Sequence, residues 1–311
     1  MCDETTTVDA ERAALLKQLI DNGLLIESGV TGVFGQSGPF ERVRDGIERW
    51  MTEAGRTAGA EQLHFPPIIP RIVLERVGYL GNFPHLAGSV FGFEGSEREG
   101  MELGARAAKH EDWSDLQTQT ELMLTPAACY PVYPAVSARG PLTGDGVLVD
   151  IGPSWVFRHE PSIDPARRQI FHMHELVRIG SPEQVSAWRE EWTERALQFF
   201  LSLGLDVSLA PANDPFFGRQ GRLLASSQRE RELKLEFVIP IVGPEPTACA
   251  SSNYAVDHLT HTFGLAFADG AEAHSACLAF GHERLVLALM RTHGFDIEQW
   301  PADVRTALGL A

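Results

Sequence analysis

Apolar residues recur at helical spacing in three long stretches of the chain. The first predicts a helix of about fourteen residues from Val8, and the second a helix from Phe40 to Ala54. The third is the clearest, because Ser181 and Gln184 form a capping box at its start and Gly204 follows its end. We interpret its apolar stripe as packing; the stripe consists of Val185, Trp188, Trp192, Phe199 and Leu203.

Residues 157–175 show the pattern of a β-hairpin, around which the rest of the chain is organised. The first strand is predicted to carry Arg158 and Glu160, and the polar loop holds Arg167 and Arg168. The returning strand places three side chains on one face: Phe171, Met173 and Glu175. A guanidinium near an aromatic ring and a carboxylate suits a nucleotide. The alternative interpretation is a surface hairpin whose charges are solvated.

Shorter apolar stretches with turn residues between them predict further strands. The stretch 122–136 is predicted to be a strand that breaks into a proline-punctuated turn holding Cys129. Further strands are predicted at 205–209, 233–241, 247–254 and 276–280, and a last helix at 282–292. Clustered short strands with helices between and after them indicate an α+β fold, an antiparallel sheet flanked by helices. We predict a single domain over residues 1–311, in which residues 1–60 form an N-terminal helical segment.

The composition is that of an ordinary globular chain: 311 residues, 44% hydrophobic and 9% aromatic. There is no apolar run of the roughly 18 residues that a membrane-spanning helix needs. The N-terminus also lacks a basic and then apolar leader, so we expect a cytoplasmic protein with no membrane partner. The 42 acidic and 26 basic residues argue against broad nucleic-acid binding, which needs a basic footprint.

The cysteines are candidates for chemistry rather than for a disulfide framework. Cys2, Cys129, Cys249 and Cys277 have no paired spacing, so reduced thiols or metal ligands are the options. Cys129 and Cys277 lie 148 residues apart, and isolated cysteines are usually small buried apolar residues. Spacing alone therefore predicts no metal site.

Two segments resemble signature motifs of class II aminoacyl-tRNA synthetases. Residues 157–160, Phe-Arg-His-Glu, with their loop and the strand from Phe171 to Glu175, resemble motif 2, and Ala279 to Arg284 resembles motif 3. The proline-rich stretch 65–84 is similar to a divergent motif 1, and 247–253 resembles the segment that precedes motif 3 in seryl-tRNA synthetases. The resemblance covers roughly residues 60–310 and implies the catalytic domain of that superfamily.

Two departures change what this resemblance implies. Seryl-tRNA synthetases carry a long N-terminal helical hairpin that grips tRNA, whereas only about sixty residues precede motif 1 here, and the acidic charge suits tRNA poorly. The chain is similar instead to the amino acid:[carrier protein] ligases, truncated homologues without this coiled-coil arm. The segments that carry the likeness are 124–134, 214–219 and 245–249. It implies activation of glycine or alanine by ATP to an aminoacyl adenylate, and transfer to the phosphopantetheine thiol of a carrier protein.

This resemblance also implies a zinc ion. By position its ligands become Cys129, Glu175 and Cys277, which also makes them the residues that bind the amino acid. Two thiolates and a carboxylate leave a fourth position open, as catalytic zinc sites do, and in the family the substrate's α-amino group takes that position. Cys249 is a rival ligand, but it lies in the segment expected to face ATP.

The ATP site implied by the resemblance places the adenine between Phe171 and Arg284, while Glu160 contacts the base or orders the loop. Arg158 holds the α-phosphate, so Arg158 and Arg284 are the expected catalytic residues. Arg167 or Arg168 reaches the β- and γ-phosphates.

A strand segment and a magnesium ion complete the expected ATP site. The segment consists of Ala248, Cys249, Ala250 and Ser251. Magnesium is expected to bridge the phosphates, with Glu236 as a candidate ligand and Ser251 as a second. The metal-binding glutamate of seryl-tRNA synthetases aligns best with Thr247, so the sequence departs from them here.

The expected partners are ATP, a small amino acid and a holo carrier protein, but no tRNA. Ala127, Ala128 and Ser275 are the candidates for the amino acid pocket. Class II domains pair through motif 1, so we expect a homodimer through residues 65–84. A basic cluster that begins with Arg219 and Arg222 is a candidate surface for the acidic carrier, although a solvated charged face would look the same.

Two other functions stay open at this stage. One is a seryl-tRNA-synthetase-like enzyme that charges tRNA, and the other is an inactive paralogue that only binds adenylate. The presence of Arg158, Phe171, Glu175 and Arg284 argues against the inactive paralogue.

Overall fold

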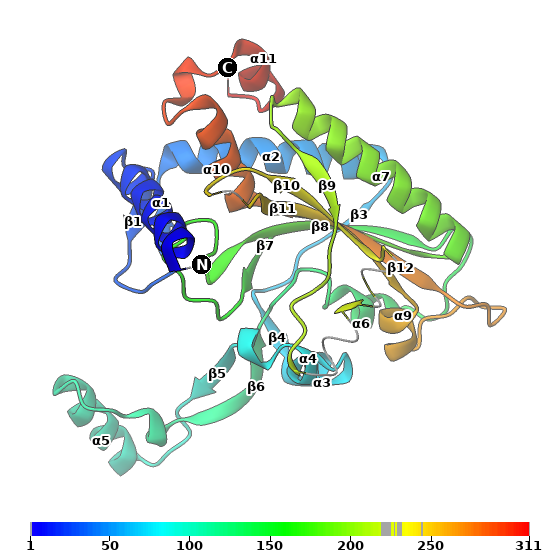
Figure 1. The fold of residues 1–311 in the computed structure, drawn as a ribbon. Coiled ribbons are helices and arrows are strands. Elements are labelled where there is room, and N and C mark those ends of the chain that lie inside the picture. The colour runs from blue at the N-terminus through cyan, green and yellow to red at the C-terminus, as the bar shows by residue number, and fades with distance from the viewer. Residues whose placement is uncertain (1, 219–224, 227, 229–231, 244, 311) are drawn as a thin grey trace.

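The computed structural model describes residues 2–218, 225–226, 228, 232–243 and 245–310 (Figure 1). The helices are α1 (Cys2–Asp21), α2 (Gly38–Thr57), α3 (Arg71–Arg76), α4 (Tyr79–Asn82), α5 (Glu97–Ala108), α6 (Val132–Ser137), α7 (Pro182–Ser202), α9 (His258–Thr262), α10 (His282–His293) and α11 (Ala302–Ala307). Short 3₁₀ turns lie at Pro84–Leu86, Ser114–Leu116 and Ile297–Gln299. The strands are β1 (Leu25–Glu27), β2 (Phe34–Gln36), β3 (Glu61–Leu63), β4 (Ile68–Pro70), β5 (Ser89–Gly92), β6 (Thr118–Leu124), β7 (Val147–Phe157), β8 (Ile170–Gly180), β9 (Ser208–Pro211), β10 (Lys234–Ile239), β11 (Thr247–Val256) and β12 (His274–Gly281).

A central sheet carries the molecule, and in the described residues it has seven strands in the order β3-β7-β8-β12-β11-β10-β9. Neighbouring strands are antiparallel, except that the edge strand β3 runs parallel to β7. The predicted α+β fold is confirmed. The parallel edge strand is an addition, because three residues of β3 were too short a signal to predict.

Helices cover both faces of this sheet. The long helices α2, α7 and α10 lie on one face, and the short helices α3, α4, α6 and α9 lie on the other (Figure 1). Strand residues therefore alternate between two hydrophobic clusters, as Leu176 and Val177 do on β8. Each face of the sheet is thus packed against helices through a cluster of buried apolar side chains.

Helix α7 follows its sequence signals closely. The Ser181 hydroxyl accepts a hydrogen bond from the Gln184 amide, and the Gln184 side chain accepts one from the Ser181 amide. The stripe that we interpreted as packing is buried, as predicted: Val185, Trp188, Trp192, Phe199 and Leu203.

The central hairpin differs from the prediction at its first strand. β7 stops at Phe157, so Arg158 and Glu160 lie in the connecting loop rather than on a strand. The chain turns there because the Glu160 amide donates back to the Arg158 carbonyl over 2.7 Å. Pro161 then follows, and a proline cannot donate to a strand ladder. β7 also begins earlier than expected, at Val147.

Two other boundaries were wrong. Helix α1 begins at Cys2, before the predicted start, and β9 begins at Ser208 rather than at 205. At 122–136 the predicted strand ends at Leu124, and the predicted turn that follows it contains helix α6. Pro131 immediately precedes that helix, where the fixed φ of proline suits a helix start.

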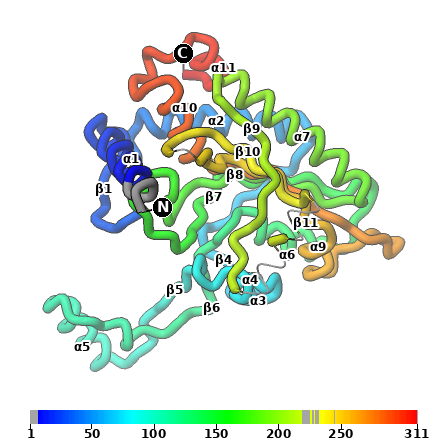
Figure 2. Tube along the Cα trace, in the orientation of Figure 1, coloured from blue at the N-terminus to red at the C-terminus, as the bar shows by residue number. Residues whose placement is uncertain are grey.

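A smaller sheet of β4, β6 and β5 carries an arm that protrudes from the body, as Figures 1 and 2 both show. Helix α5 lies at its tip, and none of the helix's described residues is buried. In the described residues, no helix combines the length and apolar character that crossing a membrane requires.

Candidate active site

A cavity of about 460 Å³ opens on the face of the sheet that carries the short helices. Its walls come from segments far apart in the sequence: the region around α4, the loop before α6, the sheet, and residues 214–216. The predicted zinc ligands Cys129, Glu175 and Cys277 all line it, and so does Arg158. The structure therefore brings the expected metal and phosphate groups into one space.

The sheet positions two of these ligands, and a loop supplies the third. Glu175 on β8 is paired with Ala279 on β12, two residues from Cys277 and on the same face. Cys129 lies in the loop before α6, and its backbone amide donates to Glu175 Oε1 over 3.1 Å. The Asn253 side chain on β11 donates to the Cys277 sulfur over 3.3 Å.

Burial shapes the electrostatics of these three groups. The pKa of the Cys129 thiol is raised, chiefly by its hydrogen bond with Cys277 and then by burial. For Cys277 the hydrogen bond from Cys129 lowers the pKa, but burial and the nearby Glu175 outweigh it, so the net shift is upward. Burial also raises the pKa of Glu175, against the hydrogen bonds that it accepts. Three buried acids side by side repel one another when ionised, which is the setting in which a cation is stabilising.

The ligand geometry itself is not formed. In the part of the chain that the structure describes, no group of three or more His, Cys, Asp or Glu side chains is arranged as a metal-binding cluster. Cys249 lies apart from the three candidates: its side chain is buried in the core behind the sheet, where burial raises its pKa to about 12.

The two residues that were predicted to hold the adenine lie next to each other. Phe171 and Arg284 line one small cavity of about 10 Å³, together with Arg168 and Glu283. Arg284 is fixed by backbone carbonyls: its Nε donates to Ala166 and its Nη1 to Ala248, over 2.7 and 2.8 Å.

Arg158 lies beside this small cavity and also reaches the larger one. Its guanidinium lies 5.6 Å from the centre of the Phe171 ring, and its Nε donates to the Pro126 carbonyl over 3.1 Å. Arg158 is half-buried, so part of its guanidinium group stays available to a ligand.

The two adjacent arginines of the loop face in different directions. Arg167 is exposed, and its Nη1 lies 3.3 Å from the Glu160 carboxylate. Arg168 is buried between Phe34 and Phe40, at 5.8 and 5.0 Å from their ring centres. Burial lowers the pKa of Arg168 to about 10, and neither of its terminal nitrogens has a hydrogen-bond partner among the described residues.

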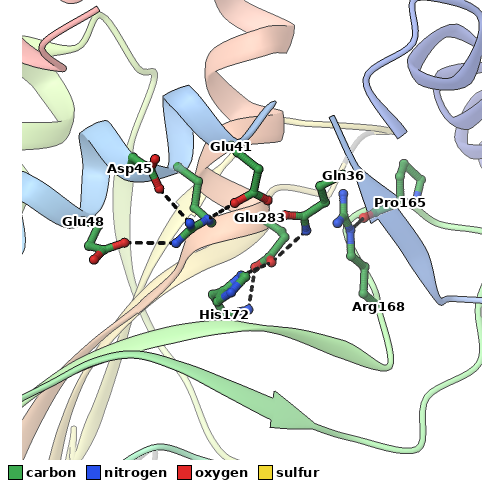
Figure 3. A network of polar contacts seen from close by, with 9 residues as sticks. Gln36, Glu41, Asp45, Glu48, Pro165, Arg168, His172 and Glu283 are labelled. Atoms are coloured by element: carbon green, nitrogen blue, oxygen red, sulfur yellow. Dashed lines mark hydrogen bonds and ion pairs between the residues drawn. The ribbon is translucent and has the colours of Figure 1, made fainter. Parts of the chain in front are cut away.

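The buried carboxylate of Glu283, the residue before Arg284, holds the backbone of β8 at His172. Figure 3 shows Glu283 between His172 and Gln36. Its Oε1 accepts from His172 Nδ1 over 2.8 Å and from Gln36 Nε2 over 3.0 Å, and its Oε2 accepts from the His172 amide. Gln36 belongs to the N-terminal segment, so that segment helps to hold Glu283, the residue next to Arg284.

The strand segment expected to face ATP, residues 248–251, lies partly in the core and partly at the cavity. The carbonyl of Ala248 holds Arg284, and Ser251 lines the larger cavity, but Cys249 and Ala250 are buried in the core. Glu236 lies across from Ser251 on β10, and its carboxylate pairs with Lys234 Nζ over 3.1 Å. Glu236 therefore already has a cation beside it.

The sequence analysis missed several residues that line the cavity. Tyr79 and Asn253 lie in segments that resemble the synthetases but were not singled out as site residues, and Asp214 and Lys234 form an ion pair of 2.7 Å that only the fold brings together. Of the pocket candidates, Ala127 lines the cavity, whereas Ala128 and Ser275 are buried beside it. The docking candidates Arg219 and Arg222 lie outside the described residues.

The sequence is similar to two groups of characterised proteins. Amino acid--[acyl-carrier-protein] ligase 1 of Bradyrhizobium diazoefficiens is 44% identical over 283 residues, which cover 91% of this chain and 86% of the relative. Ligase 2 of the same organism is 43% identical over 291 residues, with 93% and 86% covered. A type-2 serine--tRNA ligase of Methanopyrus kandleri is 24% identical and aligns with 97% of this chain but 59% of its own length. No protein-family model matches the chain.

Solved structures support the fold. The M. kandleri SerRS, in complex with A. aeolicus tRNASec, superimposes with a TM-score of 0.80 at 19% identity, over 95% of this chain and 60% of that one. A seryl-tRNA synthetase from Pyrococcus horikoshii complexed with ATP gives 0.68 at 14% identity, over 95% and 62%. The sheet and its helices are those of a class II synthetase catalytic domain.

Proposed function

Because the chain belongs to the amino acid--[acyl-carrier-protein] ligase family, we propose that it activates a small amino acid with ATP and transfers it to a holo carrier protein. The observation that carries this proposal is the convergence of Cys129, Glu175, Cys277 and Arg158 in one cavity. The acyl acceptor is the phosphopantetheine thiol of the carrier.

In the first step an oxygen of the amino acid carboxylate attacks the α-phosphorus of ATP, the bond to the β-phosphate oxygen breaks, and pyrophosphate leaves. Arg158 binds the α-phosphate and offsets the charge that develops there. Phe171 and Arg284 hold the adenine between a ring face and a guanidinium. The chain supplies no nucleophile, so its contribution is position and charge.

Of the two arginines in the loop, Arg167 is the one assigned to the β- and γ-phosphates. Its exposed guanidinium is tied only by the ion pair with Glu160, which a triphosphate can outcompete. Arg168 instead anchors the loop in the aromatic contacts of Phe34 and Phe40. Glu160 thus holds Arg167 ready and orders the loop.

Cys129, Glu175 and Cys277 are assigned to zinc. Two thiols and a carboxylate are a donor set that zinc favours, and all three side chains line one cavity. The bound ion would supply an electrophilic position for the free α-amino group of the substrate. Magnesium is assigned to the phosphates, with Glu236 and Ser251 as its candidate protein ligands.

The amino acid is proposed to be glycine or alanine, as the likeness to the family implies, and Ala127 is the small side chain that lines the cavity with the two thiols. A homodimer through residues 65–84 is also proposed. Ile68 and Ile72 in that region are exposed at 37% and 55%, which suits an apolar interface. Sedimentation as a monomer at micromolar concentration would contradict the dimer.

The test of the proposed function is ATP–pyrophosphate exchange with a panel of amino acids, followed by transfer assays. Exchange with glycine or alanine and loading of a holo carrier protein are expected. Loading of tRNA would favour the synthetase-like alternative, and adenylate binding without exchange would favour an inactive paralogue. Strong activation of leucine or phenylalanine would contradict the choice of a small amino acid.

A further inference from the structure

The chain has four tyrosines, and all of them line the larger cavity: Tyr79, Tyr130, Tyr133 and Tyr254. Two have a partner for the hydroxyl. Tyr133 donates to Ser275 over 3.2 Å, and the Tyr254 hydroxyl lies 2.5 Å from His274 Nδ1. These two hydroxyls stabilise the wall of the cavity.

Tyr79 is different, because its buried hydroxyl has no hydrogen-bond partner among the described residues. Only 4% of the residue is exposed, and its ring packs against Phe83 and Tyr130, with centre distances of 5.1 and 5.8 Å. A buried hydroxyl without a partner costs about 1 to 3 kcal/mol. A side chain held so firmly with its polar group unpaired, on a cavity wall, is a group that a ligand can satisfy.

The local backbone explains how Tyr79 is aimed. Gly78 precedes it with φ at +69°, a left-handed conformation that favours glycine, and α4 begins directly afterwards (Figure 1). The turn places the first residue of α4 against the sheet. The position of Tyr79 is therefore set by the backbone and by its aromatic neighbours.

Tyr79 and Arg158 line the same cavity, so a ligand bound there can contact both. Burial chiefly raises the pKa of Tyr79, to about 12, against the nearby Arg158, which lowers it. At neutral pH the Tyr79 hydroxyl is therefore protonated and can donate a hydrogen bond.

We infer that Tyr79 contacts the reacting group of the substrate, its hydroxyl donating to an oxygen of the acyl phosphate that forms beside Arg158. This inference rests on the proposed function, since it takes the ligand to be the amino acid carboxylate and the α-phosphate. An anionic oxygen can accept hydrogen bonds from a neutral hydroxyl and from a guanidinium at the same time, so it suits a position between these two groups. Tyr79 and Arg158 then bind that group from two sides of the cavity.

The test is Tyr79→Phe, which removes the hydroxyl and keeps the ring. The expected result is a fall of about ten- to a hundredfold in kcat/KM for ATP–pyrophosphate exchange, the loss that one hydrogen bond to a charged group produces. The free energy of unfolding should stay the same or rise, because an unpaired buried hydroxyl is removed. Zinc content should not change.

Two matched variants complete the design. Thr125→Val also removes a buried hydroxyl that has no partner among the described residues, but Thr125 is not one of the lining residues, so exchange should be unchanged. Tyr254→Phe removes a paired hydroxyl and should lower the free energy of unfolding.

The outcomes separate the inference from the proposed function. Exchange by Tyr79→Phe at the wild-type rate overturns the inference while the proposed function stands. A loss of stability equal to that of Tyr254→Phe also overturns it, because the hydroxyl would then have an internal partner. Absence of exchange in the wild-type protein contradicts both.

Discussion

The side-chain amide of Asn253 donates a hydrogen bond to the sulfur of Cys277 over 3.3 Å. The same amide donates to Ser251 over 3.0 Å, so its orientation is fixed from two sides. A donor aimed at a buried thiol stabilises the thiolate, which is the form that binds a metal.

Asn253→Ala should therefore weaken zinc binding by about tenfold or more, as the loss of an outer hydrogen bond to a metal ligand does. Competition with a chromogenic chelator measures this affinity. Asn22→Ala is a suitable control, because Asn22 is exposed and bonds only to its own helix, at the Gln18 carbonyl. Equal zinc affinity in both variants would contradict the role of Asn253 as a donor that tunes a metal ligand.

Arg167 and Arg168 should give opposite results despite their adjacency. Arg167→Ala should raise the KM for ATP by about tenfold at unchanged stability, because an exposed ion pair contributes roughly 0 to 1 kcal/mol. Arg168→Ala should instead lower the free energy of unfolding by about 2 kcal/mol, because its stem and guanidinium pack on Phe34 and Phe40. Chemical denaturation and ATP–pyrophosphate exchange kinetics, measured on both variants, test this prediction. A stability loss in Arg167→Ala with a raised KM for ATP in Arg168→Ala would contradict it.

His282 should make the protein sensitive to mild acid. Burial, with His174, His172 and Arg44 nearby, holds its pKa well below the ordinary value, while the unfolded chain has a histidine pKa of about 6.5. The unfolded state thus binds more protons below about pH 6.5, and the free energy of unfolding falls as the pH decreases.

His282→Leu should remove this contribution. Neither ring nitrogen of His282 has a hydrogen-bond partner among the described residues, so the variant should be close to the wild type at pH 7.5. Between pH 7 and 5 the wild type should lose roughly 2 kcal/mol more than the variant. Urea denaturation at several pH values measures the difference; parallel curves would mean that His282 has a polar partner.

Alternation of residues predicted a large part of the central hairpin. Phe171, Met173 and Glu175 share a face because β8 is regular there. Side chains alternate between the two faces of a regular strand, so the sequence alone is enough to predict this. The end of β7 could not be predicted, because it depends on the turn at Arg158 and Glu160. The helix α7 was predictable because its cap and stripe are local signals.

The site was less accessible to local reasoning. Cys129 and Cys277 meet only through the register of β8 and β12 and the loop before α6, so the resemblance, not their spacing, suggested them. Tyr79 lies in the stretch similar to motif 1, but its unpaired hydroxyl exists only in the folded chain. The ion pair between Asp214 and Lys234 could not be predicted either, because it joins two separate segments.

The central claim is that this chain forms an aminoacyl thioester on a carrier protein. The most direct measurement is the intact mass of a holo carrier protein after incubation with the enzyme, ATP and glycine or alanine, with the apo carrier and tRNA tested in parallel. The account predicts a mass increase of one aminoacyl group on the holo carrier only, removed by hydroxylamine. An unmodified holo carrier together with aminoacylated tRNA would contradict it.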